Sequence, residues 1–467
     1  MPSEEVCTVE PDVAQVLVDD ALLAETEGVW RSLHHPAKDE ENPVLKPDRP
    51  WEGYLVLQPG TVVYDEQDGI FKMWYNTQPS RERPDIASYL CYAVSHDGVH
   101  WEKPELGLVE HNGSTANNIQ ISGVHWTHCI LKDDTEPDAG RRYKLAYWSG
   151  SPDAPSGIYV AFSPDGIHWR QYEHSPVVPA GWATGDTFSV MRDPYSGQYW
   201  LYHKTPVEPI RTVSRMFSDD FIHWRDSRRV LAPDAFDPPD TQFYGLSAFP
   251  YAGQYLGFLW VYHTYLQTMD VQLVSSRDGL HWDRSADRKV LMHLVPTNRY
   301  TGDIFDSRMI YPVSAPVAKN DQLWIYYSGF SVPHNALPED HDGFCSLHAT
   351  GEGYVLSNPF TFHGTRLTLN ATVHGPDSVH IPPDPIWSGV CAGCQSGRGS
   401  VCVEVRDMSG TPIPGYSVSE CEVFSSDSLE ADVRWRNSPD LSSLHDRIVR
   451  LKFLLRNARL YAWQIRK

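Results

Sequence analysis

The chain has 467 residues, with 60 acidic against 39 basic side chains and a net charge of −21. This balance excludes nucleic acid and an anionic membrane surface as expected partners, because phosphate binding requires clustered Lys and Arg. No apolar stretch reaches the roughly 18 residues of a membrane-spanning helix. The acidic start, Met1–Glu5, lacks a basic segment followed by an apolar core. We therefore expect no secretion signal and a cytoplasmic location.

Residues 1–45 form a predicted N-terminal extension. The apolar residues between Asp12 and Leu33 are unevenly spaced, in a pattern compatible with a short helix before Pro36. We expect this extension to pack on the domain that follows it.

A seven-residue phrase ending in His-Trp recurs four times, as Ser95–Trp101, Ser163–Trp169, Ser218–Trp224 and Ser276–Trp282. Asp-Gly in three copies signals a tight turn; Phe221 replaces the Gly in the third, so we expect that turn to differ. Repetition at about 60 residues indicates one stacked supersecondary unit, as in a β-propeller. The Asp and His residues are interpreted as turn-making rather than ligand-binding.

An aromatic strand core accompanies the phrase and supplies the number of units. It recurs five times, as Phe71–Tyr75, Tyr143–Trp148, Tyr199–His203, Tyr255–Tyr262 and Leu323–Tyr327. These copies predict a five-bladed propeller over residues 46–360, each blade running from an inner strand to an outer strand beyond the turn. The fifth copy has no clear His-Trp phrase, and residues 347–356 are the candidate for its outer hairpin.

Short alternating runs continue to the end of the chain and predict a second domain at residues 361–467. They lie at 366–371, 399–407, 430–435, 448–455 and 459–465. Such runs, separated by Gly, Pro and Asp, are typical of an antiparallel β-sandwich. The predicted fold is thus all-β, a five-bladed β-propeller followed by an antiparallel β-sandwich.

Eight cysteines are present, and free thiols are the favoured interpretation in the absence of a secretion signal. Cys391 and Cys394, together with Cys402 and Cys421, suggest a zinc site. The second pair lacks the spacing of a zinc ribbon, so we do not predict a metal.

These patterns resemble the invertase and inulinase group of glycoside hydrolases, and most closely bacterial proteins of the family 32-like type. The resemblance rests on the His-Trp phrases and on the segments Asn42–Leu45, Trp51–Gly53, Phe71–Tyr75, Leu367–Ala371 and Gly410–Ser417. It implies a propeller followed by a sandwich, and an enzyme that hydrolyses or transfers glycosidic bonds.

The family's catalytic motifs are not matched. The Trp-x-Asn-Asp-Pro-x-Gly nucleophile motif of invertases is absent, and the Glu-Cys pair at Glu420 falls in the predicted sandwich. The letters Arg-Asp-Pro occur at 192–194, but they follow an inner strand and lead into a hairpin. We therefore reject Asp193 as a transition-state stabiliser.

The candidate site lies where the inner strands begin, because these strands converge at the propeller axis. Glycoside hydrolysis needs two carboxyl groups across the scissile bond. Glu52 is the candidate acid and Asp186 the candidate nucleophile or base, and Asp306 completes the set by tuning pKa values or binding a hydroxyl. The candidates for substrate binding are Trp51, Trp126, His128, Asp240, Tyr244, Asp303 and Arg308. In the alternative interpretation, Asp186 and Asp306 cap loops or pair with Arg308, and the two histidines His125 and His128 are structural.

The favoured function is a glycoside hydrolase or transglycosylase acting on a small carbohydrate or glycosylated substrate. It needs no redox cofactor, and a structural cation in the channel is compatible with the sequence. One alternative is a non-hydrolytic enzyme of intracellular or secondary metabolism on the same scaffold, because a fold does not fix a function. The other is a carbohydrate-binding protein without catalysis.

Overall fold

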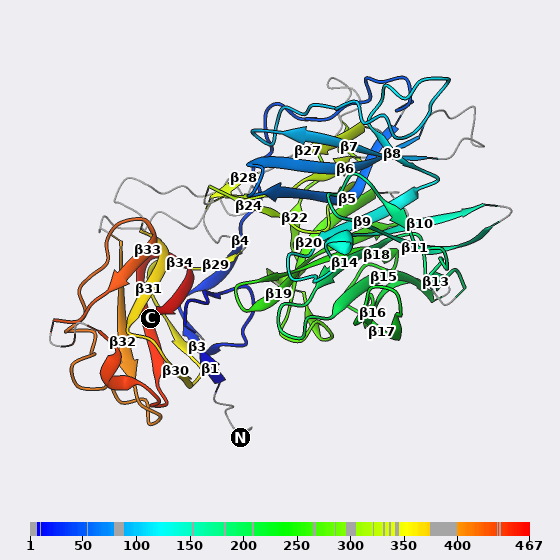
Figure 1. Ribbon diagram of the computed structural model, residues 1–467. Coiled ribbons are helices and arrows are strands. Elements are labelled where there is room, and N and C mark those ends of the chain that lie inside the picture. Colours follow the sequence, from blue (N-terminus) through cyan, green and yellow to red (C-terminus); the bar gives the residue numbers. More distant parts are fainter. Residues whose placement is uncertain are drawn as a thin grey trace, which may run out of the picture. The chain divides into compact units, whose positions relative to one another are not determined.

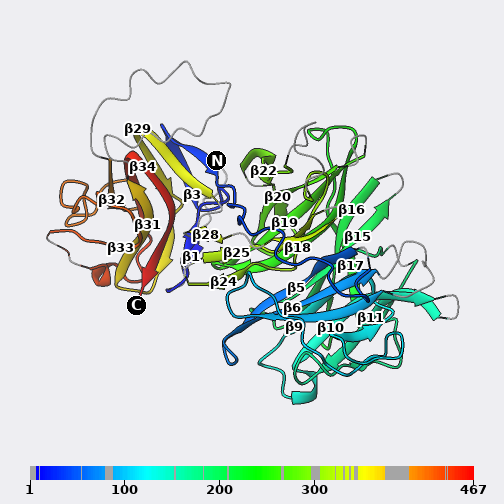
Figure 2. The same ribbon diagram turned by 90° about the horizontal axis from the view of Figure 1, so that it is seen from above.

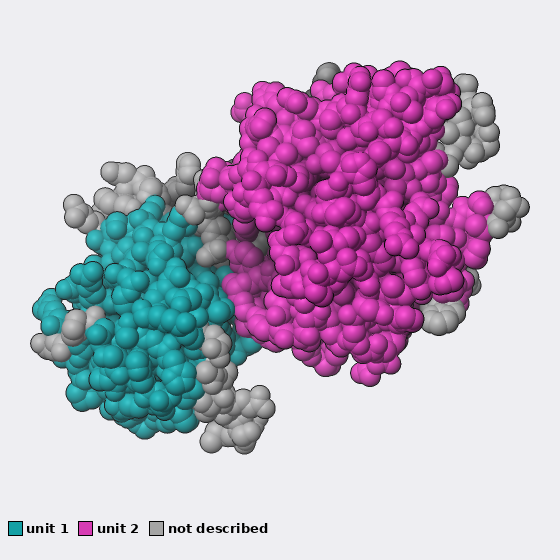
Figure 3. Space-filling view, viewed as in Figure 1, with its two compact units in different colours: residues 1–34, 285–287, 341–467 teal, residues 35–284, 288–340 magenta. Residues whose placement is uncertain are grey.

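A computed structural model describes residues 7–9, 11–53, 55–78, 88–151, 154–181, 184–207, 210–264, 268–284, 286–295, 305–320, 322–329, 332–335, 338–340, 345–373, 399–436, 438 and 440–467. The regular secondary structure of the described residues is almost entirely β-strand, as predicted, with three short 3₁₀ helices at Ala139–Arg141, Ala286–Arg288 and Ser442–Leu444. They form two compact units, coloured separately in Figure 3: residues 35–284 and 288–340, and residues 1–34, 285–287 and 341–467.

Four sheets of blade type make up most of the larger unit (Figure 1). The first is β5 (Leu55–Asp65), β6 (Ile70–Gln78), β7 (Tyr89–Ser95) and β8 (Ile119–Ser122). The second is β9 (His125–Lys132), β10 (Tyr143–Ser151), β11 (Ala154–Ser163) and β12 (Arg170–Gln171), with β13 (Val178–Pro179) on β11. The third is β14 (Phe188–Arg192), β15 (Tyr199–Val207), β16 (Ile210–Ser218) and β17 (Arg225–Leu231). The fourth is β18 (Thr241–Tyr251), β19 (Gln254–His263), β20 (Thr268–Ser276) and β21 (Trp282–Asp283), with β22 (Val290–Met292) on β20.

The prediction of five complete blades is wrong, because the residues assigned to the fifth do not form one sheet. They form two three-stranded sheets: β23 (Ile310–Pro312), β26 (Tyr327–Gly329) and β27 (Val332–Asn335); and β24 (Val317–Lys319), β25 (Gln322–Trp324) and β28 (Pro338–Asp340). These small sheets close the ring onto the first blade, where Ser314 donates its backbone N–H to the Gly60 carbonyl over 3.0 Å. Figure 2 shows the inner strands β5 and β9 of the first two blades side by side.

The His-Trp phrases are turns, as predicted. In the first, Asp97 accepts the backbone N–H groups of Val99 and His100 over 2.9 and 2.8 Å, and its second oxygen meets the His100 ring at 2.8 Å. The other three copies repeat this geometry around Asp165, Asp220 and Asp278. All four histidines are exposed at the surface.

The third turn does not differ from the others, contrary to prediction. Phe221 adopts a φ of 68°, close to the 69° of Gly279 in the fourth turn. A Cβ on Gly279 would lie 2.3 Å from the Trp200 ring of the preceding blade. The blade before the third turn has the small Ala146 in the matching strand, and Phe221 is fully buried in the same hydrophobic cluster. Packing of this side chain therefore compensates for its unfavourable backbone conformation.

Adjacent blades are joined by a repeated hydrogen bond between a tyrosine and an aspartate. The carboxylate at the end of one inner strand accepts the hydroxyl of a tyrosine on the second strand of the next blade. The pairs are Asp65–Tyr143 at 3.0 Å, Asp133–Tyr199 at 2.6 Å and Asp193–Tyr255 at 2.6 Å. Asp193 therefore has a structural role at a hairpin, in agreement with its rejection as a catalytic residue.

The Asp133→Asn variant should lose stability at neutral pH and show a weaker acid dependence. Burial alone would raise the pKa of Asp133, but hydrogen bonds from Tyr199 and Thr135 and the charge of Lys144 outweigh it and lower the pKa to about 2. A carboxylate with a lowered pKa stabilises the fold above its unfolded-state pKa of about 3.9 and loses this contribution as the pH falls toward 2. Thermal melts at pH 7, 4 and 2 should therefore differ less in the variant than in the wild type. An unchanged pH dependence would contradict this role of Asp133.

The smaller unit is built on one long strand, β34 (Arg450–Arg466). An eight-stranded sheet joins it to β2 (Gln15–Val16), β3 (Leu23–Glu27), β4 (Trp30–Leu33), β29 (Cys345–Ser357), β31 (Arg366–Val373), β32 (Ser400–Arg406) and β33 (Ser428–Val433). A second, two-stranded sheet pairs β1 (Cys7–Val9) with β30 (Phe360–Phe362) in parallel. A sandwich of two sheets was predicted for this region. The described residues form one sheet of eight strands and one of two strands.

Two predictions for this region are wrong. The expected helix between Asp12 and Leu33 is replaced by β2, β3 and β4, because these residues pair with β34 and β29. Residues 347–356 are not the outer hairpin of a fifth blade. They belong to β29, and Leu347 and Val355 are buried in the core of the smaller unit. Long-range pairing with β34 therefore overrides local sequence patterns in both segments.

Candidate functional site

The described site is centred on Asp186, Lys204 and Tyr244, at the starts of the inner strands of blades three and four. Asp186 lies two residues before β14, and Lys204 lies opposite it on β15. The Lys204 ammonium is 2.5 Å from a carboxylate oxygen of Asp186 and 4.2 Å from the centre of the Tyr244 ring. The Lys204 side chain is 11% exposed and that of Asp186 34%, so this ion pair remains accessible to a ligand.

Local backbone features position these side chains. Gly185 approaches β15 closely, since a Cβ on it would lie 2.8 Å from the Lys204 side chain. In β18 the register with β19 shifts between Phe243 and Gly245, which makes Tyr244 the extra residue of a β-bulge. A bulge re-aims the side chain it carries and is typical of sheet positions next to functional sites.

A second group of polar and aromatic residues surrounds Tyr244. The Tyr262 and Tyr311 rings lie 5.8 and 6.3 Å from the Tyr244 ring, both edge-on. Burial, together with the neighbouring tyrosines and the Asp186 charge, raises the pKa of Tyr311, which keeps its hydroxyl protonated. Arg211, at the start of β16, donates a hydrogen bond to Gln242 and lies 5.5 Å from the Tyr244 ring centre. A carboxylate beside hydroxyl groups, aromatic faces and cations is suited to binding sugar hydroxyl groups.

Sequence reasoning identified Asp186 and Tyr244 and missed Lys204, Arg211 and Tyr311. Lys204 directly follows the third aromatic core, and its position opposite the start of an inner strand was a usable signal. Arg211 and Tyr311 approach Tyr244 from strands of other blades or sheets, which no local pattern indicates.

The environment of Glu52 is that of a structural carboxylate. It is fully buried and accepts hydrogen bonds from the backbone N–H groups of Asp48 and Arg49, at 2.9 and 3.0 Å. The Tyr75 hydroxyl at 2.6 Å and the Lys103 ammonium at 2.7 Å complete its shell. With every neighbour a protein donor, Glu52 has no open side toward a substrate, so the geometry does not support its prediction as the acid.

Asp306 is enclosed in a similar way. It is fully buried, and one of its oxygens accepts a 2.7 Å hydrogen bond from Tyr327 and pairs with the Lys38 ammonium. Its other oxygen is buried without a hydrogen-bond partner. The structural interpretation, in which Asp306 forms an ion pair, fits these contacts, although its partner is Lys38 rather than Arg308.

Three of the residues proposed to bind substrate have different surroundings. Trp126 is 47% exposed at the start of β9, which leaves its ring open for stacking. Trp51 is half-buried, and its indole N–H donates a 2.7 Å hydrogen bond to Asn118. His128 is fully buried and meets the Trp74 carbonyl at 2.8 Å. Burial outweighs this hydrogen bond and lowers the pKa of His128 to about 4, so the ring is a neutral structural group.

The other proposed residues are Asp240, Arg308 and Asp303. Asp240 is half-buried directly before β18, and its carbonyl accepts the backbone N–H of Thr264 over 3.0 Å. Arg308 is exposed, and its carbonyl accepts the backbone N–H of Met269 over 2.8 Å. Asp303 lies outside the described residues.

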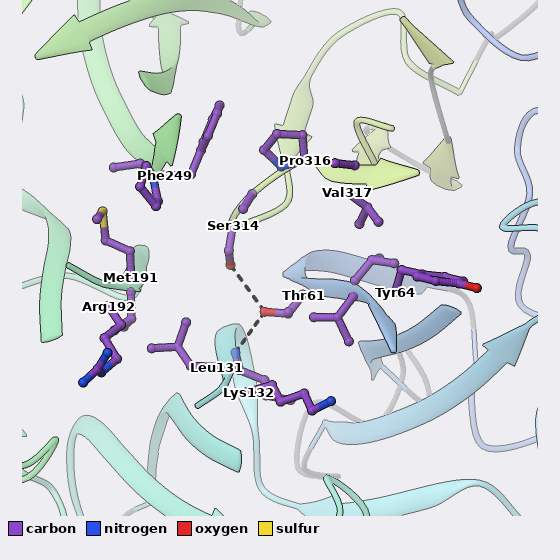
Figure 4. Close-up of a pocket in the computed structure, with 18 of the residues that line it drawn as sticks. Thr61, Tyr64, Leu131, Lys132, Met191, Arg192, Phe249, Ser314, Pro316 and Val317 are labelled. Carbon is purple, nitrogen blue, oxygen red and sulfur yellow. Dashed lines mark hydrogen bonds between the residues drawn. The ribbon is translucent and has the colours of Figure 1, made fainter. Parts of the chain in front are cut away.

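A cavity of about 330 Å³ lies at the opposite ends of the inner strands (Figure 4). Leu131, Met191, Phe249 and Val317 provide apolar walls, and Thr61 and Ser314 approach each other at 3.4 Å. No carboxylate among the predicted catalytic residues lines it. The cavity is therefore separate from the group around Asp186.

The described residues contain no group of three or more His, Cys, Asp or Glu side chains placed to hold a metal ion. Cys391 and Cys394 of the zinc hypothesis lie outside the described part of the chain. Within that part, Cys402 and Cys421 are free thiols. In the same described segments, no helix is long and apolar enough to cross a bilayer.

No family model matches the chain. Uncharacterized proteins from two strains of Mycobacterium tuberculosis, CDC 1551 / Oshkosh and H37Rv, are each 30% identical to it over 158 residues, which is 33% of this chain and 44% of theirs. The chain thus spans less than half the length of the curated relatives it matches.

Solved structures with a similar arrangement include carbohydrate-active propeller enzymes. A member of the GH130 family of mannoside phosphorylases has a TM-score of 0.45 and 13% identity, covering 66% of this chain and 94% of its own. A β-1,2-mannobiose phosphorylase from Listeria innocua has a TM-score of 0.45 and 14% identity, covering 67% and 97%. A fructofuranosidase from Schwanniomyces occidentalis has a TM-score of 0.43 and 12% identity, covering 91% and 97%. Similarity at this level does not transfer an activity, so the chemistry rests on the residues of the site.

Proposed function

We propose that this chain is a carbohydrate-active enzyme, a glycoside hydrolase or transglycosylase, whose sugar site lies at the starts of the inner strands. Asp186 is its reactive carboxylate, acting as nucleophile or base. Asp240, which precedes the inner strand of the neighbouring blade, is the second carboxyl group. Glycosidic bond cleavage requires such a pair, one group to protonate the leaving oxygen and the other to attack the sugar or activate water.

The Asp186–Lys204 ion pair beside the bulged Tyr244 carries this proposal. The lysine fixes the direction of the carboxylate, because a charge-assisted hydrogen bond is short and geometrically defined. The Tyr262 and Tyr311 rings lie edge-on to Tyr244 and extend the aromatic surface beside the pair. Exposed Trp126, at the same end of the ring, offers an aromatic face on which a sugar can stack.

The proposal is tested by incubating the full chain with a panel of aryl glycosides that covers the common pyranoses and furanoses in both anomeric forms. Release of the aryl group from at least one member is expected, and product NMR then gives the stereochemical outcome. Sugar binding without any cleavage would favour the carbohydrate-binding alternative. Neither binding nor cleavage would reject the assignment.

A further inference from the structure

Arg211 carries a positive charge that no carboxylate among the described residues balances. Its guanidinium lies 5.5 Å from the Tyr244 ring centre and 5.6 Å from that of Tyr262, and one N–H donates to the side-chain oxygen of Gln242. Other arginines of the same unit do have carboxylate partners, such as Arg284 with Asp237 at 2.5 Å.

The second cation of the site does not share this property. Lys204 is neutralised by Asp186 at 2.5 Å, so Arg211 is the cation of this site that has no carboxylate partner among the described residues. This charge is held in a defined direction, since Gln242 accepts from one arm of the guanidinium and two tyrosine rings lie beside it. Arginine presents several further N–H donors in a planar fork. The side chain is half-buried and has no carboxylate partner in the described part of the chain, so these donors are available to a ligand anion.

We propose that the sugar recognised at this site bears a carboxylate, as a uronic acid does, and that Arg211 binds this group. The inference rests on the proposed function and specifies its substrate class. A planar carboxylate matches the guanidinium fork and needs a single positive charge. A phosphate dianion would call for more, and Lys204 is already neutralised by Asp186.

The test measures binding by calorimetry in the wild-type protein, in which Lys204 keeps its Asp186 partner, with free monosaccharides that carry no glycosidic bond to cleave. The probes are glucuronate, galacturonate and mannuronate, each compared with its neutral sugar. At least one uronate should bind about tenfold or more tightly than the matching neutral sugar, and this preference should weaken as salt is added. Arg211→Gln should abolish the preference, so that each uronate then binds no more tightly than its neutral sugar. Arg211→Lys should restore part of it, because the charge returns without the fork.

Arg215→Gln is the matched control. Arg215 lies on the same strand, also over an aromatic ring, with its guanidinium 4.4 Å from the Trp200 ring centre. It also donates to the carbonyl of Asp278 in the fourth turn, at 3.4 Å. The uronate preference should survive in this variant, and thermal melts should show that all variants are folded.

Equal affinity for acidic and neutral sugars, or a preference that persists in Arg211→Gln, would overturn the inference while leaving the proposed function standing. If inorganic phosphate alone binds more tightly than every uronate, and does so through Arg211, the ligand of Arg211 is a free oxyanion rather than a sugar carboxylate. That result would also overturn the inference. Failure of every sugar to bind would remove the proposed function itself.

Discussion

The Asp186→Asn variant is expected to lose turnover by about 10²- to 10⁴-fold while remaining folded. The substitution keeps the size of the side chain but removes the charge needed for a nucleophile or a base. Lys204 loses its ion-pair partner, but both side chains retain access to solvent, which limits the effect on stability. The rate is to be measured on whichever glycoside the wild type cleaves, with circular dichroism to confirm the fold.

Asp219→Asn provides the control for charge removal. Asp219 lies in the third turn, exposed and paired with Arg225, and has no contact with the site. This variant should keep the wild-type rate. Full activity of a folded Asp186→Asn protein would show that another carboxylate performs the chemistry.

The Glu52→Gln variant is expected to lower the free energy of unfolding by about 3 to 5 kcal/mol, the usual effect of breaking a buried ion pair. Glu52 is fully buried, and its partner Lys103 is only 4% exposed. An amide in its place supplies one acceptor oxygen where the carboxylate supplied two, and its NH₂ group faces protein donors. The lysine then remains buried without its counter-charge. Urea unfolding at pH 7 measures the change directly.

Asp48→Asn is the matched control, because Asp48 pairs with the same lysine at 2.7 Å but is 62% exposed. Its loss should cost no more than about 1 kcal/mol, as for a surface ion pair. If Glu52→Gln instead keeps full stability and loses only turnover, Glu52 is the catalytic acid after all and the structural assignment is wrong.

The repeat was predictable from the sequence because its signals are local. Each Asp-x-x-His-Trp turn satisfies its own backbone within four residues, so the turns and the strands that precede them could be placed correctly. The similarity of the third turn to the others was missed because it depends on two blades. Beside a glycine turn, an aromatic residue of the preceding blade packs against the glycine, as Trp200 does against Gly279. The blade before the third turn has Ala146 in the matching strand, and Phe221 fills that space.

The candidate site was predicted only in part, for the same reason. Asp186 and Tyr244 were found because they lie at the starts of inner strands, which the blade register fixes. Glu52 satisfied the same criterion but is enclosed by Tyr75 and by Lys103, which lies 51 residues further along the chain. The order of residues in the sequence does not reveal such a partner. Residues 347–356 were misplaced because only pairing with β34, about a hundred residues away, defines their sheet.

The most direct test of the account is a crystal structure of the Asp186→Asn protein soaked with a substrate that the wild type cleaves. The account predicts a sugar ring at the starts of the inner strands, within hydrogen-bond distance of position 186 and Lys204 and in contact with Tyr244. A sugar bound instead in the cavity beside Thr61 and Ser314, with the Asp186 region empty, would contradict it.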